Sequence, residues 1–185
     1  ITDEFRKGFE FMQKYPKSVS LFGSARLTPA SSHYHDAQRL AERIIQETGY
    51  CVITGGGPGI MKAINMGAKG VHGQSVGLNI NIPREQDMNS GVVDSLKFNY
   101  FFSRKAMLTF SAETYVFYPG GYGTFDELFS VLTLIQTRKI PKVPVILMGK
   151  DFWIPFQNFI EEHMLNEHHT ISEEDAKLFM EKAKG

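Results

Sequence analysis

Three times along this chain, a short apolar run ends in a turn of small residues and is followed by a segment with helical periodicity. The runs have no polar face, which is typical of strands covered on both sides of a sheet. Strands that alternate with helices in this way build a mostly parallel sheet. The three turns comprise residues 23–26, 55–59 and 119–124.

This pattern predicts an α/β protein with a Rossmann-like three-layer fold, in which a mostly parallel sheet is flanked by helices. Apolar residues at helical spacing, followed by Pro16, predict an N-terminal helix within residues 1–16. Because 185 residues without a linker suffice for one core, we expect a single nucleotide-binding domain over 1–185. The other predicted helices are 33–47, 60–69, 103–111, 123–137, 151–165 and 172–183, and the predicted strands are 19–22, 50–54, 74–80, 97–102, 114–118 and 143–148.

Composition excludes several classes of partner. Lys plus Arg and Asp plus Glu number 20 each, which argues against binding nucleic acid through bulk charge. No apolar run is long enough to span a membrane, and no signal peptide is recognisable. The single cysteine, Cys51, lies in an apolar run and fits a reducing compartment. We therefore expect a cytoplasmic protein with no nucleic-acid or membrane partner.

The three turns predict a ligand site. In open α/β sheets the ligand crevice lies beyond the carboxyl ends of the strands, so the turns should converge there. Glycines let a ligand approach the backbone closely, and the unpaired amides at a helix start attract phosphate. A nucleotide or another phosphorylated ligand is the expected occupant. The dinucleotide fingerprint is incomplete, because Ile60 stands where its last glycine belongs. Neither a Walker motif nor a lysine in a Schiff-base setting is evident.

Two features of the site region leave alternatives open. The spacing of Thr124 and Glu127 matches a capping box, although this would not explain the glycines just before it. Arg104 and Lys105 open a predicted helix, where a cation opposes the macrodipole unless an anion compensates it. They are either a surface pair or part of an anion site. His33 and His35 lack a strong metal-ligand spacing, so no metal is predicted. Most rings of the aromatic cluster at 98–102 should pack in the core, and one could wall a base-binding pocket.

Three motifs together resemble the LONELY GUY (LOG) family, long labelled possible lysine decarboxylases. They are Gly-Gly-Gly-Pro-Gly-Ile-Met at 55–61, Arg-Lys-Ala at 104–106 and Pro-Gly-Gly-Tyr-Gly-Thr at 119–124 followed by Glu127. The resemblance covers roughly residues 18–155. It implies cleavage of nucleoside 5′-monophosphates, such as AMP or cytokinin nucleotides, to free base and ribose 5-phosphate, by a homodimer or higher homo-oligomer.

The resemblance also assigns residues. Arg104 and Glu127 are the implied catalytic pair, and the glycine-rich turn with Thr124 is the implied phosphate site. The first turn, Gly-Ser-Ala-Arg at 23–26, departs from the plant type and leaves the preferred base open, adenine or N6-modified adenine. The expected substrate-binding residues are Gly23, Ser24, Gly56, Gly57, Gly59, Met61, Lys105, Gly120, Gly121, Tyr122, Gly123 and Thr124.

Glycosidic cleavage builds positive charge on the sugar, which Glu127 would stabilise, or it would activate the attacking water. Arg104 would orient Glu127 and contact the ribose or phosphate. The scheme requires neither a metal nor an organic cofactor, and no residue stands out as proton donor to the base. Two other hypotheses remain: a non-catalytic nucleotide sensor or carrier in which Glu127 only caps its helix, and a decarboxylase that would need pyridoxal phosphate.

Overall fold

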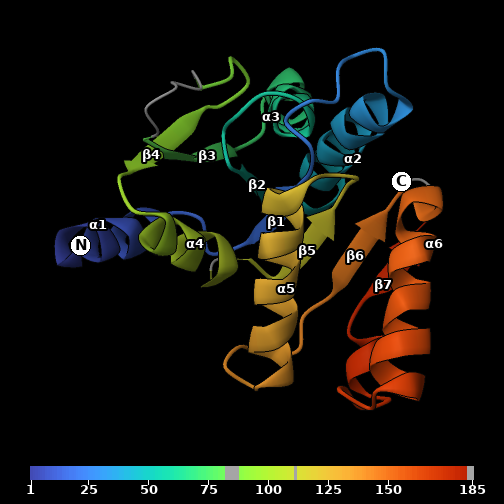
Figure 1. Ribbon diagram of the computed structural model, residues 1–185. Helices are drawn as coiled ribbons and strands as arrows, with labels where there is room; N and C mark the ends of the chain where they lie inside the picture. The colour runs from blue at the N-terminus through green and yellow to red at the C-terminus, as the bar shows by residue number, and fades with distance from the viewer. Residues whose placement is uncertain (82–87, 111, 183–185) are drawn as a thin grey trace.

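The computed structural model of the protein describes residues 1–81, 88–110 and 112–182 (Figure 1). Within these residues, seven strands form one sheet in the order β4-β3-β2-β1-β5-β6-β7, and every neighbouring pair is parallel. The predicted parallel sheet is therefore confirmed. The strands are β1 Ser18–Phe22, β2 Cys51–Thr54, β3 Ser75–Ile80, β4 Asp94–Phe98, β5 Thr114–Phe117, β6 Val145–Met148 and β7 Met180–Lys182.

Helices cover both faces of this sheet and complete the predicted three layers. Helices α2 and α3 pack on one face, while α1, α4, α5 and α6 pack on the other (Figure 1). The helices are α1 Thr2–Met12, α2 Ser32–Thr48, α3 Ile60–Gly70, α4 Phe101–Phe110, α5 Tyr122–Gln136 and α6 Lys150–Phe159, with a π-helical segment η1 Ile160–Glu167 and a 3₁₀ turn η2 Asp175–Lys177. None of the helices in the described part of the chain is both long and apolar enough to cross a bilayer.

The central strands lack a polar face because both of their faces are covered. In β1, Leu21 is buried against the α2 and α3 side, and the next residue, Phe22, is buried on the opposite side. Phe22 stacks on Phe117 of the neighbouring strand β5, with ring centroids 4.8 Å apart. Alternate side chains of one strand thus enter two separate cores, as the uninterrupted apolar runs predict.

The strand order positions a crevice beside β1. From β1 the chain builds outward through β2, β3 and β4, and then returns to the other side of β1 to form β5. Such a reversal separates the connections that leave the two neighbouring strands, so a ligand crevice opens at their carboxyl ends. The turns that follow β1, β2 and β5 meet there. The Ser24 amide donates to the Pro119 carbonyl (3.0 Å), and the Ile60 amide donates to the Ser24 carbonyl (3.0 Å).

Two predicted elements are wrong. Residues 172–182 do not form a helix, because η2 is a single turn and residues 180–182 form β7 instead. Pairing with the exposed edge of β6, where Ile146 aligns with Met180, outweighs the local helical pattern. The extended segment expected at 97–102 is strand β4 only as far as Phe98, and Phe101 already begins α4.

Candidate active site

A cavity of about 630 Å³ occupies the crevice beside β1. It is bounded by the turns that follow β1, β2 and β5, by α4 and by the first turn of α5. The predicted convergence of the three turns is therefore confirmed. The lining residues are Phe22, Gly23, Ser24, Ala25, Arg26, Gly55, Met61, Phe101, Arg104, Leu108, Gly121, Tyr122, Gly123, Thr124, Phe125, Asp126 and Glu127.

Helix α5 begins at this cavity. Gly121 is its N-cap, and the Gly121 carbonyl accepts hydrogen bonds from the amides of Thr124 (3.0 Å) and Phe125 (3.1 Å). The amides of the first turn precede the intrahelical ladder and face outward from the helix start. Because Thr124 already lies inside the helix and no side chain caps it, the capping-box interpretation of Thr124 and Glu127 is wrong. The position of Glu127 needs another explanation.

Glu127 is a buried carboxyl group that lines the cavity. Its residue is only 7% exposed, and within the described part of the chain its Oε2 atom has no hydrogen-bond partner. Burial raises the pKa of this carboxyl group to about 7, against the opposing influence of the nearby Lys105 and Arg104 cations. A buried polar atom without a partner is costly in a folded protein, so it indicates a group kept for a ligand or for chemistry.

Arg104 lies on α4 and holds its guanidinium beside Glu127. Its Nε donates to the Leu78 carbonyl at the end of β3 (2.7 Å), which fixes the half-buried side chain. Burial lowers the pKa of Arg104, and the charge of Glu127 counteracts that effect. The guanidinium passes close to Gly55, where an added Cβ would overlap it. Gly55, which the sequence analysis did not select, thus makes room for the arginine.

Three glycines of the second turn, Gly56, Gly57 and Gly59, have structural roles outside the cavity lining. Gly56 adopts a positive φ of 73° and packs on Gly77 of β3. Gly59, with φ of 69°, sits directly against the backbone of residues 24–25, where no side chain would fit. Gly57 only offers its carbonyl to Asn89 (2.8 Å). The structure therefore places Gly56, Gly57 and Gly59 as supports of the site rather than as residues that face its cavity.

A buried polar network holds this second turn in place. Asn65 of α3 accepts from Thr54 (2.7 Å) and from Asn89 (2.9 Å), and it donates to Ser75 (2.7 Å). Thr54 in turn accepts from the Gly56 amide (3.0 Å). The ends of β2 and β3 are thereby joined to the turn. No sequence motif predicts this network, because its members lie far apart along the chain.

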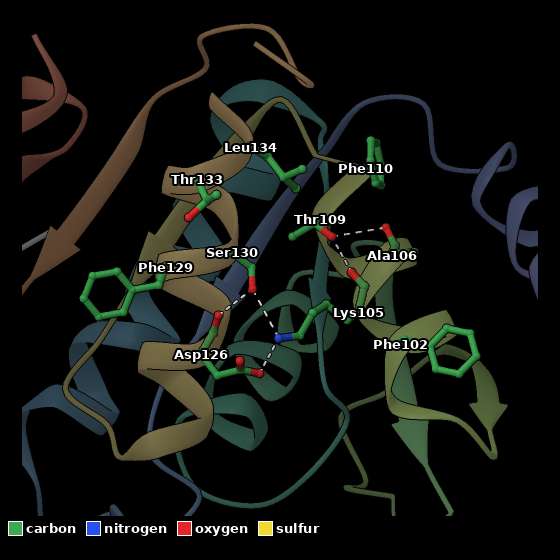
Figure 2. Close-up of a pocket in the computed structure, with 10 residues that line it drawn as sticks. All are labelled: Phe102, Lys105, Ala106, Thr109, Phe110, Asp126, Phe129, Ser130, Thr133 and Leu134. Atoms are coloured by element: carbon green, nitrogen blue, oxygen red, sulfur yellow. Dashed lines mark hydrogen bonds and ion pairs between the residues drawn. The ribbon is translucent and has the colours of Figure 1, made fainter. Parts of the chain in front are cut away.

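Lys105 does not reach the cavity beside β1. Figure 2 shows it in a second cavity, of about 490 Å³, which is a groove between α4 and α5. Its ammonium group pairs with Asp126 and donates to Ser130 (3.2 Å). Three partly exposed rings, Phe102, Phe110 and Phe129, border this groove. Asp126 lines both cavities and therefore lies on the wall between them.

Of the predicted binding residues, Gly23, Ser24, Met61, Gly121, Tyr122, Gly123 and Thr124 line the first cavity, together with the predicted catalytic pair. Gly120 lies just behind it, where an added Cβ would overlap the Thr124 side chain. The expectation that most rings of the aromatic cluster pack in the core is wrong, because Phe98 is buried whereas Tyr100, Phe101 and Phe102 are exposed; Phe101 lines the cavity. Arg26 was not predicted from its sequence pattern, although its place in the first small-residue turn was a usable signal.

A separate group of potential metal ligands lies elsewhere. Within the described residues, His163, Glu167 and His168 form the one such group, and all three are exposed on or next to η1. None of them lines either of the two cavities described above. His33 and His35, which were judged weak metal candidates, are not part of this group.

Similar proteins share this sequence and fold. The rice protein named cytokinin riboside 5′-monophosphate phosphoribohydrolase LOG is 34% identical over 75% of this chain and 57% of its own length. The Arabidopsis thaliana protein LOG2, named for the same activity, is 32% identical over 70% of this chain and 62% of its own length. The match thus spans about three fifths of each plant relative. Among solved structures, the molybdenum cofactor carrier protein of Chlamydomonas reinhardtii superposes with a TM-score of 0.67 over 92% of this chain and 91% of its own, at 21% identity.

The carrier protein supports the fold alone, because its identity is low. The match to a family model says more about this chain than the structural match does. The model described as possible lysine decarboxylase matches residues 61–184, which include Arg104 and the complete third turn with Glu127. The chain therefore belongs to the possible lysine decarboxylase family, the family of the LOG proteins.

Proposed function

We propose that this protein hydrolyses the N-glycosidic bond of nucleoside 5′-monophosphates, either AMP or a cytokinin riboside 5′-monophosphate, to a free base and ribose 5-phosphate. The observation that carries the proposal is Glu127, a buried carboxyl group with an unpartnered oxygen that lines a cavity beside a fixed guanidinium. The names of the rice and Arabidopsis relatives agree with this reaction.

The substrate phosphate would bind at the start of α5. The outward amides at residues 121–123 and the Thr124 hydroxyl would supply donors, and the helix start favours negative charge. Glu127 follows Gly123 by four residues on the same helix, a rise of about 6 Å along the axis. This separation suits a nucleotide whose phosphate lies at the helix start and whose glycosidic carbon lies beside Glu127. Anchoring the phosphate would thus place the reacting bond.

Bond cleavage moves electrons from the glycosidic bond to the base and leaves an oxocarbenium-like sugar; water then adds its hydroxyl to the sugar carbon, and a proton ends on the departing base. The Glu127 carboxylate would stabilise the positive charge at the sugar, or take a proton from the attacking water. Arg104 would hold Glu127 in place and contact the ribose hydroxyls or the phosphate as a donor fork. Met61, Phe101 and Leu108 offer an apolar wall against which the flat base could lie.

The test is an incubation of the purified protein with AMP and with N6-isopentenyl AMP, followed by chromatography of the free base and of ribose 5-phosphate. The wild-type protein should release both products, whereas Glu127→Gln should lose at least about a hundredfold in kcat, given the usual weight of acid-base groups. Glu174→Gln, which changes an exposed glutamate outside both cavities, is the matched control and should keep full activity.

The rival function is a nucleotide sensor or carrier on the same scaffold. It is distinguished by calorimetry, because a carrier would bind intact AMP stoichiometrically and release no base. Equal AMP affinity of wild type and Glu127→Gln, with no product from either, would contradict the hydrolase proposal. A decarboxylase would instead show the absorbance of pyridoxal phosphate.

We also propose that the protein self-associates through the groove between α4 and α5. Phe102, Phe110 and Phe129 expose 50%, 54% and 41% of their surface along this groove. Apolar rings that cluster on one face are more often part of an interface than of a free surface. A second copy of the chain is the proposed occupant, because the face carries both protruding rings and a groove to receive them.

A further inference from the structure

We propose that Arg26 determines the specificity of the site for phosphorylated substrates, by clamping the substrate's phosphate at the mouth of the cavity. This inference rests on the proposed function and deepens it. Arg26 lines the same cavity as Glu127, but it lies on the exposed rim, whereas Glu127 is buried. The two residues would therefore meet opposite parts of one bound nucleotide.

Arg26 is an exposed cation of this cavity, whereas Arg104 is half-buried. Arg104 also lines the cavity, but its guanidinium is anchored to the Leu78 carbonyl and lies beside Glu127. Lys105 is engaged with Asp126 and Ser130 in the second cavity (Figure 2). In the described part of the chain, Arg26 forms no ion pair.

The backbone brings Arg26 toward the start of α5. The Ser24 amide is bonded to the Pro119 carbonyl, two residues before the Gly121 N-cap, so the first and third turns are directly joined. The Arg26 amide then donates to the Ser24 hydroxyl (3.0 Å), which folds residues 24–26 into a tight turn. The arginine on this turn therefore lines the same cavity as the first turn of α5.

This arrangement suits a dianionic phosphate better than an uncharged group. A guanidinium can offer two parallel N–H donors to phosphate oxygens, and the α5 amides would satisfy the remaining ones. A nucleoside has only a hydroxyl group at that position and gains nothing from the cation. Arg26 should therefore separate nucleotides from nucleosides while contributing little to recognition of the base.

The experiment is isothermal titration of wild type, Arg26→Ala and Arg26→Lys with AMP, ribose 5-phosphate and adenosine. Arg26→Ala should weaken AMP and ribose 5-phosphate binding about tenfold or more, and adenosine binding by less than twofold. The affinities of Arg26→Lys for AMP and ribose 5-phosphate should lie between those of wild type and Arg26→Ala. Lysine keeps the positive charge but lacks the paired donors of the guanidinium. Arg43→Ala is the control for lost charge, because Arg43 of α2 pairs with Glu47 and lines neither cavity.

Ribose 5-phosphate carries no base and is not cleaved, so its affinity reports binding apart from turnover, and the two proposals can fail independently. Weaker ribose 5-phosphate binding by Arg26→Ala in a protein whose wild type releases no base from AMP would support the clamp and defeat the hydrolase. Base release from AMP with equal ribose 5-phosphate affinity in wild type and Arg26→Ala would defeat the clamp alone. An equal loss for adenosine and AMP, or no binding of either phosphorylated probe by wild type, would also overturn the role given to Arg26.

Discussion

At the scale of single residues, Glu127 shows a conflict between stability and function. Its pKa is raised to about 7 from an ordinary value of 4.5, chiefly by burial. Between these two values the folded protein holds a proton that the unfolded chain releases, so stability falls as the pH rises. Above pH 7 the loss in the free energy of unfolding is complete, and it amounts to on the order of 3 kcal/mol.

Glu127→Gln should therefore stabilise the protein at high pH. The variant cannot ionise, so its free energy of unfolding should exceed that of wild type by a margin that grows from pH 5 to pH 8, up to about 3 kcal/mol. Urea denaturation at the two pH values measures this margin. Glu174→Gln should show no such change, and a margin that is the same at both pH values would contradict the buried-carboxyl argument.

The same raised pKa should set the pH dependence of the proposed hydrolysis. If Glu127 acts as a carboxylate, kcat/KM should fall about tenfold for each pH unit below about 7 and level off above it. The substrate phosphate has its own second pKa near 6, which would produce a separate bend at lower pH. Initial rates with AMP from pH 5.5 to 8.5 resolve the two, and a profile with a bend near 6 alone would contradict the assignment.

The sequence predicted the charged residues that line the cavity better than the residues that support them. Glu127 and Arg104 were found because their motifs are contiguous and specific. Arg26 and Gly55 were missed, since their roles depend on which turns meet in space. Lys105 was expected beside Arg104 in the site, but neighbouring helical residues point in different directions, and it faces the second cavity instead. Local spacing also made Thr124 and Glu127 resemble a capping box, although α5 begins earlier.

At the scale of elements, a change at the start of α5 can affect folding stability and ligand affinity in opposite directions. An added Cβ at Gly123 would meet no atom within 4 Å, and the residue lies inside a helix, where alanine is favoured over glycine. Gly123→Ala should raise the free energy of unfolding by roughly 0.5–1 kcal/mol. It should nevertheless weaken AMP binding at least several-fold, because the open space at Gly123 belongs to the cavity.

Gly120→Ala is the matched variant for this prediction. Its Cβ would overlap the Thr124 side chain, so it should lose both stability and AMP affinity. Thermal unfolding and calorimetry of the two variants make the comparison. Unchanged AMP affinity in a well-folded Gly123→Ala protein would place the phosphate elsewhere than the start of α5.

The network around Asn65 makes a second prediction at this scale. Asn65→Ala removes hydrogen-bond partners from the buried Thr54 at the end of β2 and the buried Ser75 at the start of β3, while Asn89 keeps its bond to the Gly57 carbonyl. The free energy of unfolding should fall by about 2–4 kcal/mol, since leaving buried polar groups unpaired is expensive. Urea denaturation measures the loss. Asn158→Ala, on the exposed side of α6, is the control, and equal effects of both changes would contradict the network's role.

At the scale of the whole molecule, alternation of strands and helices was enough to predict the parallel sheet and the edge at which its turns meet. Near the C-terminal end, the helical pattern gave a wrong prediction, because β7 forms there by pairing with β6. That failure has a physical reason, because an open sheet edge offers a row of backbone partners that local propensity does not reveal. The proposed single domain over 1–185 stays a prediction, and the remaining exposed feature at this scale is the ring-bordered groove between α4 and α5.

Self-association through this groove makes the last prediction. Wild type should sediment as a dimer or larger species at micromolar concentration, whereas Phe110→Asp should dissociate, because a partner surface would have to bury the new charge. Phe110 is 54% exposed, so the monomeric fold should tolerate the change. Phe159→Asp alters an equally exposed ring on α6 and should leave the assembly intact. Dissociation of both variants, or of neither, would place the interface on another face of the molecule.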